Sequence, residues 1–218
     1  MIKLYGVARS RASRNIWMLK EIGLDFELVP VIQVYRLPDP NAANAPLHTR
    51  SKAFLDINPN ARVPALDDDG FVMTESLAIN LYLARRYGGD LGPRDAQEDG
   101  LMTMWSLWAA TECEQRALEI LSNRVSNPAG ELDEGKAQAA VAALRAPFKV
   151  LDQALAETGH VVGDRFTAAD INLAEVLRYA QPAPELFHAA PNVRAWIEAC
   201  QSRPAYHAMA AMRAAEPA

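Results

Sequence analysis

The residues best suited to binding chemistry lie in segment 58–66 and at the start of the helix expected after it. Pro64 stands where a strand should begin, and a proline there either takes a sheet edge or adopts a cis bond that turns the backbone of Val63 outward. An outward backbone can pair with the backbone of a ligand. Glu75 and Ser76 fall at a helix N-terminus, where free N–H groups attract a carboxylate and Glu75 can accept a charged amine. The pattern therefore predicts a site for a small peptide-like anion that has the two ends of an α-amino acid.

The first part of the chain alternates strand and helix patterns that can position these residues. The expected elements are a strand at 2–5, a helix at 14–22 that Gly23 ends, a strand at 26–34, two strands at 63–66 and 71–74 around a hairpin turn, and a helix at 76–87. This order predicts a βαβ unit followed by a hairpin and a helix. The loop from Tyr35 to Arg50 contains prolines and is long for a compact domain, so it is either mobile or part of the site.

The character of the chain changes after Gly89, where strand alternation stops. The helices expected beyond it run over 101–121 and, through Pro147, over 137–157, and a third begins at Thr167. We assign Thr167 and the acidic residue three positions later to helix capping, not to chemistry. The chain is thus expected to have a first domain, a linker and an all-helical second domain, at 1–88, 89–97 and 98–218.

The composition argues against several classes of function. The 218 residues include 22 Lys and Arg against 27 Asp and Glu, so the chain lacks the basic footprint of a nucleic-acid-binding protein. No apolar run reaches the length of a bilayer span, and we expect a cytoplasmic protein without a membrane partner. Cys113 and Cys200 form no Cys-x-x-Cys pair and stand in helical patterns, so neither is expected to be a redox centre. We also expect no metal cofactor.

Four segments, in this order and spacing, resemble the cytosolic glutathione transferase family, and its bacterial serine-type members in particular, over nearly the whole chain. The segments are Leu4-Tyr5-Gly6 with Ser10 downstream, Ile57 to Leu66, Thr74-Glu75-Ser76, and Phe166-Thr167-Ala168-Ala169-Asp170. The resemblance implies a thioredoxin-like α/β domain followed by an all-helical domain, usually as a homodimer. It also implies that glutathione is the co-substrate and is held mainly by the first domain.

The resemblance further implies which side chain activates the glutathione thiol. Thiolate is the reactive form, so the enzyme must favour ionisation of a group whose free pKa is about 8.5. Ser10 matches the activating serine of serine-type members, and we favour it. Tyr5 is the runner-up, because tyrosine-type members use a phenolic O–H near this place. From the residues alone, Ser10 would be a helix N-cap, with Ser13 as a competing cap, and Tyr5 would be ordinary strand packing.

The same resemblance implies the residues that hold glutathione. They are Val63 and the cis-proline Pro64 for the cysteinyl backbone, and Glu75 with Ser76 for the γ-glutamyl end. Arg62 is a further candidate, as the partner of the glycine carboxylate, with a solvated surface charge as its alternative role. The loop from Tyr35 to Arg50 looks longer than in the family. We therefore carry no glycine-carboxylate contact over to His48 or Lys52.

The second substrate is expected against the long helix of the second domain. This helix carries Trp105, Trp108 and Glu112 at helical spacing, although core packing is an alternative role for at least one tryptophan. We predict that the thiolate attacks a small hydrophobic electrophile. The same fold also suits a glutathione-dependent isomerase or dehalogenase. A non-catalytic module that binds glutathione or hydrophobic ligands is the alternative from another class.

Overall fold

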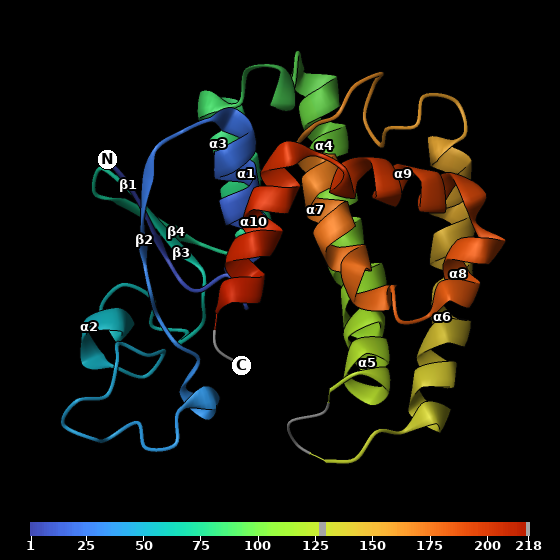
Figure 1. Cartoon of the computed structure of the whole chain (residues 1–218). Helices are drawn as coiled ribbons and strands as arrows, with labels where there is room; N and C mark the ends of the chain where they lie inside the picture. The colour runs from blue at the N-terminus through green and yellow to red at the C-terminus, as the bar shows by residue number, and fades with distance from the viewer. Residues whose placement is uncertain (127–129, 217–218) are drawn as a thin grey trace. The chain divides into compact units, whose positions relative to one another are not determined.

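The computed structural model describes residues 1–126 and 130–216, which form two compact units (Figure 1). Unit 1 comprises Met1–Tyr87 together with the chain from Pro204 onward, and unit 2 comprises Gly88–Arg203. The boundaries expected from the sequence assigned 204–218 to the second domain. In the structure, the helix of this segment packs on the first helix of the chain and is therefore grouped with unit 1.

Unit 1 is built on a mixed sheet with the strand order β2-β1-β3-β4. The strands are β1 (Ile2–Tyr5), β2 (Phe26–Val29), β3 (Ala65–Asp68) and β4 (Phe71–Thr74). β1 pairs in parallel with β2 and antiparallel with β3, which in turn pairs antiparallel with β4. The predicted strand at 26–34 is wrong in its length, because Pro30 has no N–H group to donate and the ladder ends at Val29.

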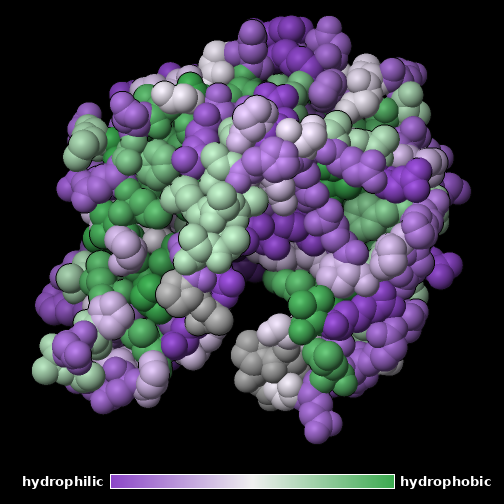
Figure 2. Space-filling model, viewed as in Figure 1, coloured by the Kyte–Doolittle hydropathy of each residue, from purple (hydrophilic) through white to green (hydrophobic). Residues whose placement is uncertain are grey.

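Four α-helices complete unit 1 within its described residues. They are α1 (Ala12–Ile22), α2 (Lys52–Leu55), α3 (Ser76–Tyr87) and α10 (Pro204–Ala215), with a 3-10 turn at Val34–Arg36. Figure 1 shows α1 and α3 packed beside each other and α10 next to α1. The side chain of Trp17 in α1 is fully buried, and its ring meets that of Tyr206 in α10 edge-on, with centroids 4.9 Å apart. Figure 2 shows a pale apolar surface over α10, as its alanines and methionines would give.

All regular elements among the described residues of unit 2 are helical, as predicted. Its elements are α4 (Ala96–Trp108), a π-helical turn (Ala109–Cys113), α5 (Glu114–Arg124), α6 (Glu134–Leu155), α7 (Ala168–Leu177), α8 (Pro184–Ala189) and α9 (Pro191–Gln201), with 3-10 turns at Gly89–Leu91 and Arg178–Ala180. The predicted single helix at 101–121 is therefore two α-helices joined by the π turn. Helix α4 begins earlier than predicted, because the Asp95 side chain caps the N–H groups of Gln97 and Glu98.

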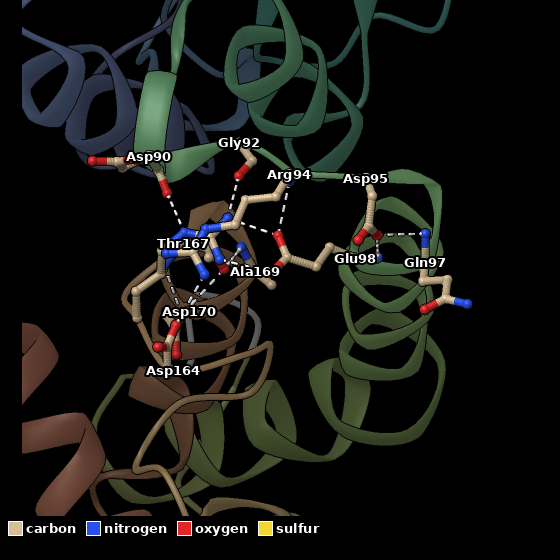
Figure 3. Close-up of polar contacts among 11 residues, drawn as sticks. Asp90, Gly92, Arg94, Asp95, Gln97, Glu98, Asp164, Thr167, Ala169 and Asp170 are labelled. Atoms are coloured by element: carbon tan, nitrogen blue, oxygen red, sulfur yellow. Dashed lines mark hydrogen bonds and ion pairs between the residues drawn. The ribbon is translucent and has the colours of Figure 1, made fainter.

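The beginning of unit 2 is held by a partly buried ion pair between Arg165 and Glu98, which is labelled in Figure 3. The Arg165 guanidinium donates to both carboxylate oxygens of Glu98, at 2.9 and 2.7 Å, and to the carbonyl oxygens of Asp90 and Gly92. Hydrogen bonding to Arg165 holds the pKa of Glu98 down at about 2. The segment predicted as a linker, 89–97, is thus attached to unit 2 at several points.

The predicted capping role of Thr167 is confirmed, and Figure 3 shows the residues involved. The Thr167 hydroxyl accepts from the Ala169 N–H group, while the Asp170 carboxylate accepts from the Thr167 N–H group at 2.9 Å. Asp170 is fully buried and also accepts from the indole N–H of Trp196 at 2.8 Å. This pair therefore starts α7 and fixes it against α9.

Candidate functional site

Gly6 brings together the two segments that were predicted to bind the ligand. A Cβ atom built on Gly6 would lie 2.7 Å from the Cβ of Ala12, 3.6 Å from the Cβ of Val63 and 3.7 Å from the Oγ of Ser10. Non-bonded carbon atoms prefer separations of about 3.5–4.0 Å, so the backbone at Gly6 and helix α1 can approach this closely only because Gly6 has no side chain. Ser10 and Val63 consequently lie within a few ångströms of the same point in unit 1.

Ser10 lies in the turn that leads into α1, and its hydroxyl group makes two local hydrogen bonds. It donates to the carbonyl oxygen of Val7 at 2.7 Å and accepts from the N–H group of Ala12 at 3.0 Å. The N-cap position of α1 belongs to Arg11, and Ser13 lies inside the helix. Neither serine is therefore the N-cap. The Ser10 hydroxyl stands beside the positive end of the α1 dipole.

Tyr5, the runner-up for thiol activation, ends β1 and packs against a core cluster. This cluster consists of Val31, Phe54 and Ala65, and the ring centroids of Tyr5 and Phe54 are 6.4 Å apart. The half-buried tyrosine thus has the packing role that is ordinary at the end of a strand.

The peptide bond between Val63 and Pro64 is cis. The pairing of β3 with β1 and β4 begins at Ala65, so Val63 and Pro64 lie just before the ladder. Val63 is half-buried and packs on the same core cluster as Tyr5, while Pro64 is buried. The strand end that was predicted to face a ligand therefore lies next to Ser10.

Asn58 organises the loop that leads to this cis bond. Its side chain donates to the carbonyl oxygen of Arg62 at 2.6 Å and accepts from the N–H group of Asn60 at 3.1 Å, and the residue is only 2% exposed. Sequence reasoning gave Asn58 no role, although an asparagine that accepts from the backbone two residues later is a known turn former. The Arg62 side chain itself is exposed.

Glu75 and Ser76 begin α3, as predicted. Glu75 has a φ of 70°, in the left-handed region that residues with a side chain rarely adopt. Ser76 is buried, and its hydroxyl oxygen accepts from Arg14 of α1 at 3.0 Å. Arg14 is 1% exposed and adds a buried positive charge at the start of α3. The contact of Arg14 with Ser76 was not predicted from the sequence, because the two residues are 62 positions apart.

The long loop between Tyr35 and Arg50 uses His48 for its own structure. The Nδ1 atom of His48 accepts from the Arg50 N–H group at 3.2 Å, and its Nε2 atom lies 3.1 Å from the carbonyl oxygen of Pro40. Lys52 pairs with Asp56 one turn along α2, at 2.8 Å. His48 and Lys52, to which we carried over no glycine-carboxylate contact, therefore both have local partners.

The residues predicted to meet the electrophile belong to unit 2. Trp105 is 9% exposed and Trp108 is half-buried, and their rings meet edge-on with centroids 5.1 Å apart. Glu112 is exposed in the π turn. Trp105 is thus largely buried, whereas Trp108 and Glu112 are more exposed on unit 2.

Cys113 and Cys200 are both free and buried. Burial raises the pKa of the Cys113 thiol to about 12, which keeps it protonated and unreactive near neutral pH. Among residues 1–126 and 130–216, no group of three or more His, Cys, Asp and Glu side chains is arranged to hold a metal ion. None of the helices within these ranges is both long and apolar enough to cross a membrane.

Comparison with known proteins identifies the family of both halves. Residues 9–86 match the family described as "Glutathione S-transferase, N-terminal domain", and residues 131–199 match "Glutathione S-transferase, C-terminal domain". The chain is 33% identical over 217 residues to glutathione S-transferase 3 of Zea mays, covering 94% of this chain and 91% of that protein.

Solved structures with the same fold include two that contain glutathione or a conjugate of it. Glutathione S-transferase I from maize, in complex with an atrazine glutathione conjugate, superposes with a TM-score of 0.83 at 28% identity and covers 99% of both chains. A theta class glutathione S-transferase from Xanthomonas axonopodis with glutathione bound gives a TM-score of 0.79 at 27% identity, covering 94% of this chain and 95% of that one. The predicted thioredoxin-like domain followed by helices is thereby confirmed, and this chain belongs to the glutathione S-transferase family.

Proposed function

We propose that this protein conjugates the glutathione thiolate to small hydrophobic electrophiles, with Ser10 as the group that stabilises the thiolate. The observation that carries the proposal is the convergence of Ser10 and Val63 on Gly6, beside the cis bond to Pro64. This arrangement places a hydroxyl donor, Ser10, close to a strand end, Val63, with whose backbone a peptide ligand can pair. Membership of the family supports the same class of reaction.

Ser10 acts by offering a stronger hydrogen bond to the thiolate than to the thiol. Lowering the thiol pKa by two units from about 8.5 requires roughly 2.7 kcal/mol of preferential stabilisation. The Ser10 hydroxyl donates to the neutral carbonyl of Val7, and turning it toward a sulfur anion would replace a neutral acceptor by a charged one. The N-terminus of α1 adds a favourable dipole. Tyr5, whose ring packs toward Phe54, remains the runner-up.

The reaction itself needs no further side-chain nucleophile. The thiol proton passes to solvent when the thiolate forms, and the sulfur lone pair then makes a bond to the electrophilic carbon of the second substrate. In a substitution, the leaving group departs with the electron pair of the broken bond. Isomerase and dehalogenase reactions begin with the same addition and would use the same residues.

The two ends of glutathione meet opposite charges in unit 1. We assign the γ-glutamyl amine to the Glu75 carboxylate and the γ-glutamyl carboxylate to Ser76 and the N-terminus of α3, where the buried Arg14 adds positive charge. Arg62, with its exposed side chain, is the proposed partner of the glycine carboxylate. The backbone of Val63, presented by Pro64, pairs with the cysteinyl unit.

Trp105, Trp108 and Glu112 are proposed to line the electrophile pocket. The half-buried Trp108 ring offers an apolar surface, and the exposed Glu112 carboxylate is held on a π turn, a feature that is frequent at functional sites. An aromatic surface favours small hydrophobic substrates.

We further propose that the protein is a cytoplasmic homodimer. Each unit by itself exposes apolar side chains that suit a partner, namely Phe71 and Val72 in unit 1 and Leu101, Met104 and Leu107 in unit 2. The two free, buried cysteines agree with a reducing compartment. Analytical ultracentrifugation of the purified chain tests the dimer.

Conjugation of glutathione to chlorodinitrobenzene tests the proposed reaction, beside ultraviolet titration of the bound thiol. We expect turnover, a bound-thiol pKa well below 8.5, and in Ser10→Ala a loss of kcat of about a hundredfold with a thiol pKa near its free value. Tyr5→Phe, the matched removal of the rival hydroxyl, is expected to retain most activity. The reverse result would make Tyr5 the activator. Tight glutathione binding with an unshifted thiol pKa would instead favour the non-catalytic module.

A further inference from the structure

The carboxylate of Glu216 binds the backbone that immediately precedes Ser10. Its Oε1 atom accepts from the Ala8 N–H group at 2.5 Å, and its Oε2 atom accepts from the Arg9 N–H group at 2.7 Å. Successive backbone N–H groups form favourable binding sites for anions, and hydrogen bonds to an ionised acceptor are the strong ones. The chain thus returns over 208 residues to fix the short turn between β1 and α1.

Two further contacts hold Arg9 in this turn. Its Nε atom donates to the carbonyl oxygen of Arg213 at 3.1 Å, in the last turn of α10, where carbonyl groups lack helical partners and a cation is favourable. Gln33 donates its side-chain amide to the carbonyl oxygen of Arg9 at 3.3 Å. Arg9 is therefore held by its N–H group, its carbonyl group and its side chain.

The orientation of the Ser10 hydroxyl depends on this same backbone. Ser10 follows Arg9 directly, and the acceptor of its hydroxyl is Val7, directly before Ala8. Glu216 thus binds the two residues that separate Ser10 from its own acceptor. We propose that Glu216 is a positioning residue, which sets the Ser10 hydroxyl toward the glutathione sulfur. The catalytic effect of Glu216 rests on the proposed function, whereas its hydrogen bonds to Ala8 and Arg9 do not.

The carboxylate has two opposing effects on a nearby thiol. By holding the backbone, it keeps the Ser10 donor in place and lowers the thiol pKa. By its charge alone, it would disfavour a second anion and raise the thiol pKa. Because both of its oxygens accept from backbone N–H groups, part of that charge is compensated locally, and we expect positioning to be the larger effect. The two effects predict pKa changes of opposite sign when Glu216 is removed.

Steady-state kinetics and thiol titration of the full chain separate these effects. For Glu216→Ala we expect kcat for chlorodinitrobenzene conjugation to fall about tenfold, as is typical of a displaced catalytic group, with a raised pKa of the bound thiol. Glu216→Gln keeps an acceptor oxygen and should recover part of both properties. KM for glutathione should change less than kcat, since Val63, Glu75 and Ser76 lie on other elements. Glu157→Ala, which removes an exposed glutamate of unit 2, is the matched control and should behave as wild type.

Two kinetic results would overturn the inference, in variants whose circular dichroism matches wild type. One is an unchanged kcat and thiol pKa in Glu216→Ala, and the other is a lowered thiol pKa in both Glu216 variants. Failure of the proposed function is recognised separately, because wild type itself would then show no conjugation. In that case, amide hydrogen exchange tests whether Glu216 holds the backbone N–H groups of Ala8 and Arg9. Faster exchange of the Ala8 and Arg9 amides in Glu216→Ala supports it, and unchanged exchange overturns it.

Discussion

Glu75 combines an unfavourable backbone conformation with the proposed contact to the glutathione amine. With its φ of 70°, a residue that has a Cβ atom is disfavoured by roughly 1–2 kcal/mol. Such conformations persist at binding sites where the surrounding structure determines them. Here the carbonyl oxygen of Glu75 also accepts a hydrogen bond from the N–H group of Ile79 in the first turn of α3, at 2.9 Å. The left-handed turn thus both starts the helix and sets the direction of the carboxylate.

Two substitutions at this position separate backbone strain from ligand binding. Glu75→Gly and Glu75→Ala both remove the carboxylate, but only glycine adopts a positive φ without steric cost. After allowing for the greater freedom of glycine in the unfolded chain, we expect Glu75→Gly to be more stable than Glu75→Ala by about 1 kcal/mol in urea unfolding. KM for glutathione should rise to a similar extent in both variants. A KM that changes in neither would remove Glu75 from the proposed clamp.

Among single residues, those that the sequence could identify lie in short local motifs. Ser10, Pro64 and Glu75 were named because the segments around them resemble those of a family. The contacts of Arg14 and Glu216 were not predicted, because their partners are distant in the chain. Arg14 meets Ser76, 62 residues away, and Glu216 meets Ala8 across 208 residues. No local pattern encodes contacts of that range.

At the scale of elements, the close approach of β1 and α1 depends on the missing side chain of Gly6. Gly6→Ala would place a Cβ atom 2.7 Å from the Cβ of Ala12, so α1 or the turn before it must move. We expect a loss of stability of about 1–3 kcal/mol and a larger relative loss of conjugation activity, since Ser10 lies in that turn. Both are measured on the same purified variant, by urea unfolding and by kcat.

A second substitution provides the control for this steric argument. In the double variant Gly6→Ala with Ala12→Gly, the carbon atom that clashes is absent. The double variant should therefore be more stable than Gly6→Ala alone, even though a glycine within α1 itself costs up to about 1 kcal/mol. A double variant that is less stable than the single one would mean that the clash does not control the packing.

The elements themselves followed from the sequence wherever local chemistry determines them. Helix α3 and strand β4 have the predicted bounds, and the hairpin between β3 and β4 has a positive φ at both Asp69 and Gly70, as such turns require. The differences have physical causes that a periodic pattern does not reveal. The π turn at Ala109–Cys113 divides the helix predicted as one, and the early starts of α4 and α6 depend on caps by Asp95 and Asp133.

For the whole molecule, the ion pair of Glu98 with Arg165 makes stability dependent on pH. The pKa of Glu98 is about 2 in the folded protein and has an ordinary value of 4.5. Because the folded pKa is the lower one, the stabilisation is fully present above pH 4.5 and is lost as the pH falls through 2. The pair also attaches the segment around Asp90 and Gly92.

Thermal unfolding of Glu98→Gln beside wild type tests this dependence. We expect a lower Tm for Glu98→Gln at pH 7 and a difference that narrows as the pH is lowered from about 5 to about 3. In this range the unfolded wild-type chain takes up a proton at Glu98, whose ordinary pKa is 4.5, while the folded protein, with a pKa of about 2, does not. Glu157→Gln, an exposed site, should follow wild type throughout. A Tm difference that stays constant over this range would assign the effect to lost packing instead of charge.

The grouping of α10 with unit 1 has a consequence for biosynthesis. Trp17 is fully buried and packs against Tyr206 of α10, so unit 1 is complete only after a segment that leaves the ribosome later than all of unit 2. Unit 2 consists of the continuous residues 88–203 and is therefore fully synthesised before α10. During synthesis, unit 2 would therefore be able to fold before unit 1 is complete. Unit 1, which is proposed to hold glutathione, would then be the last part of the chain to fold.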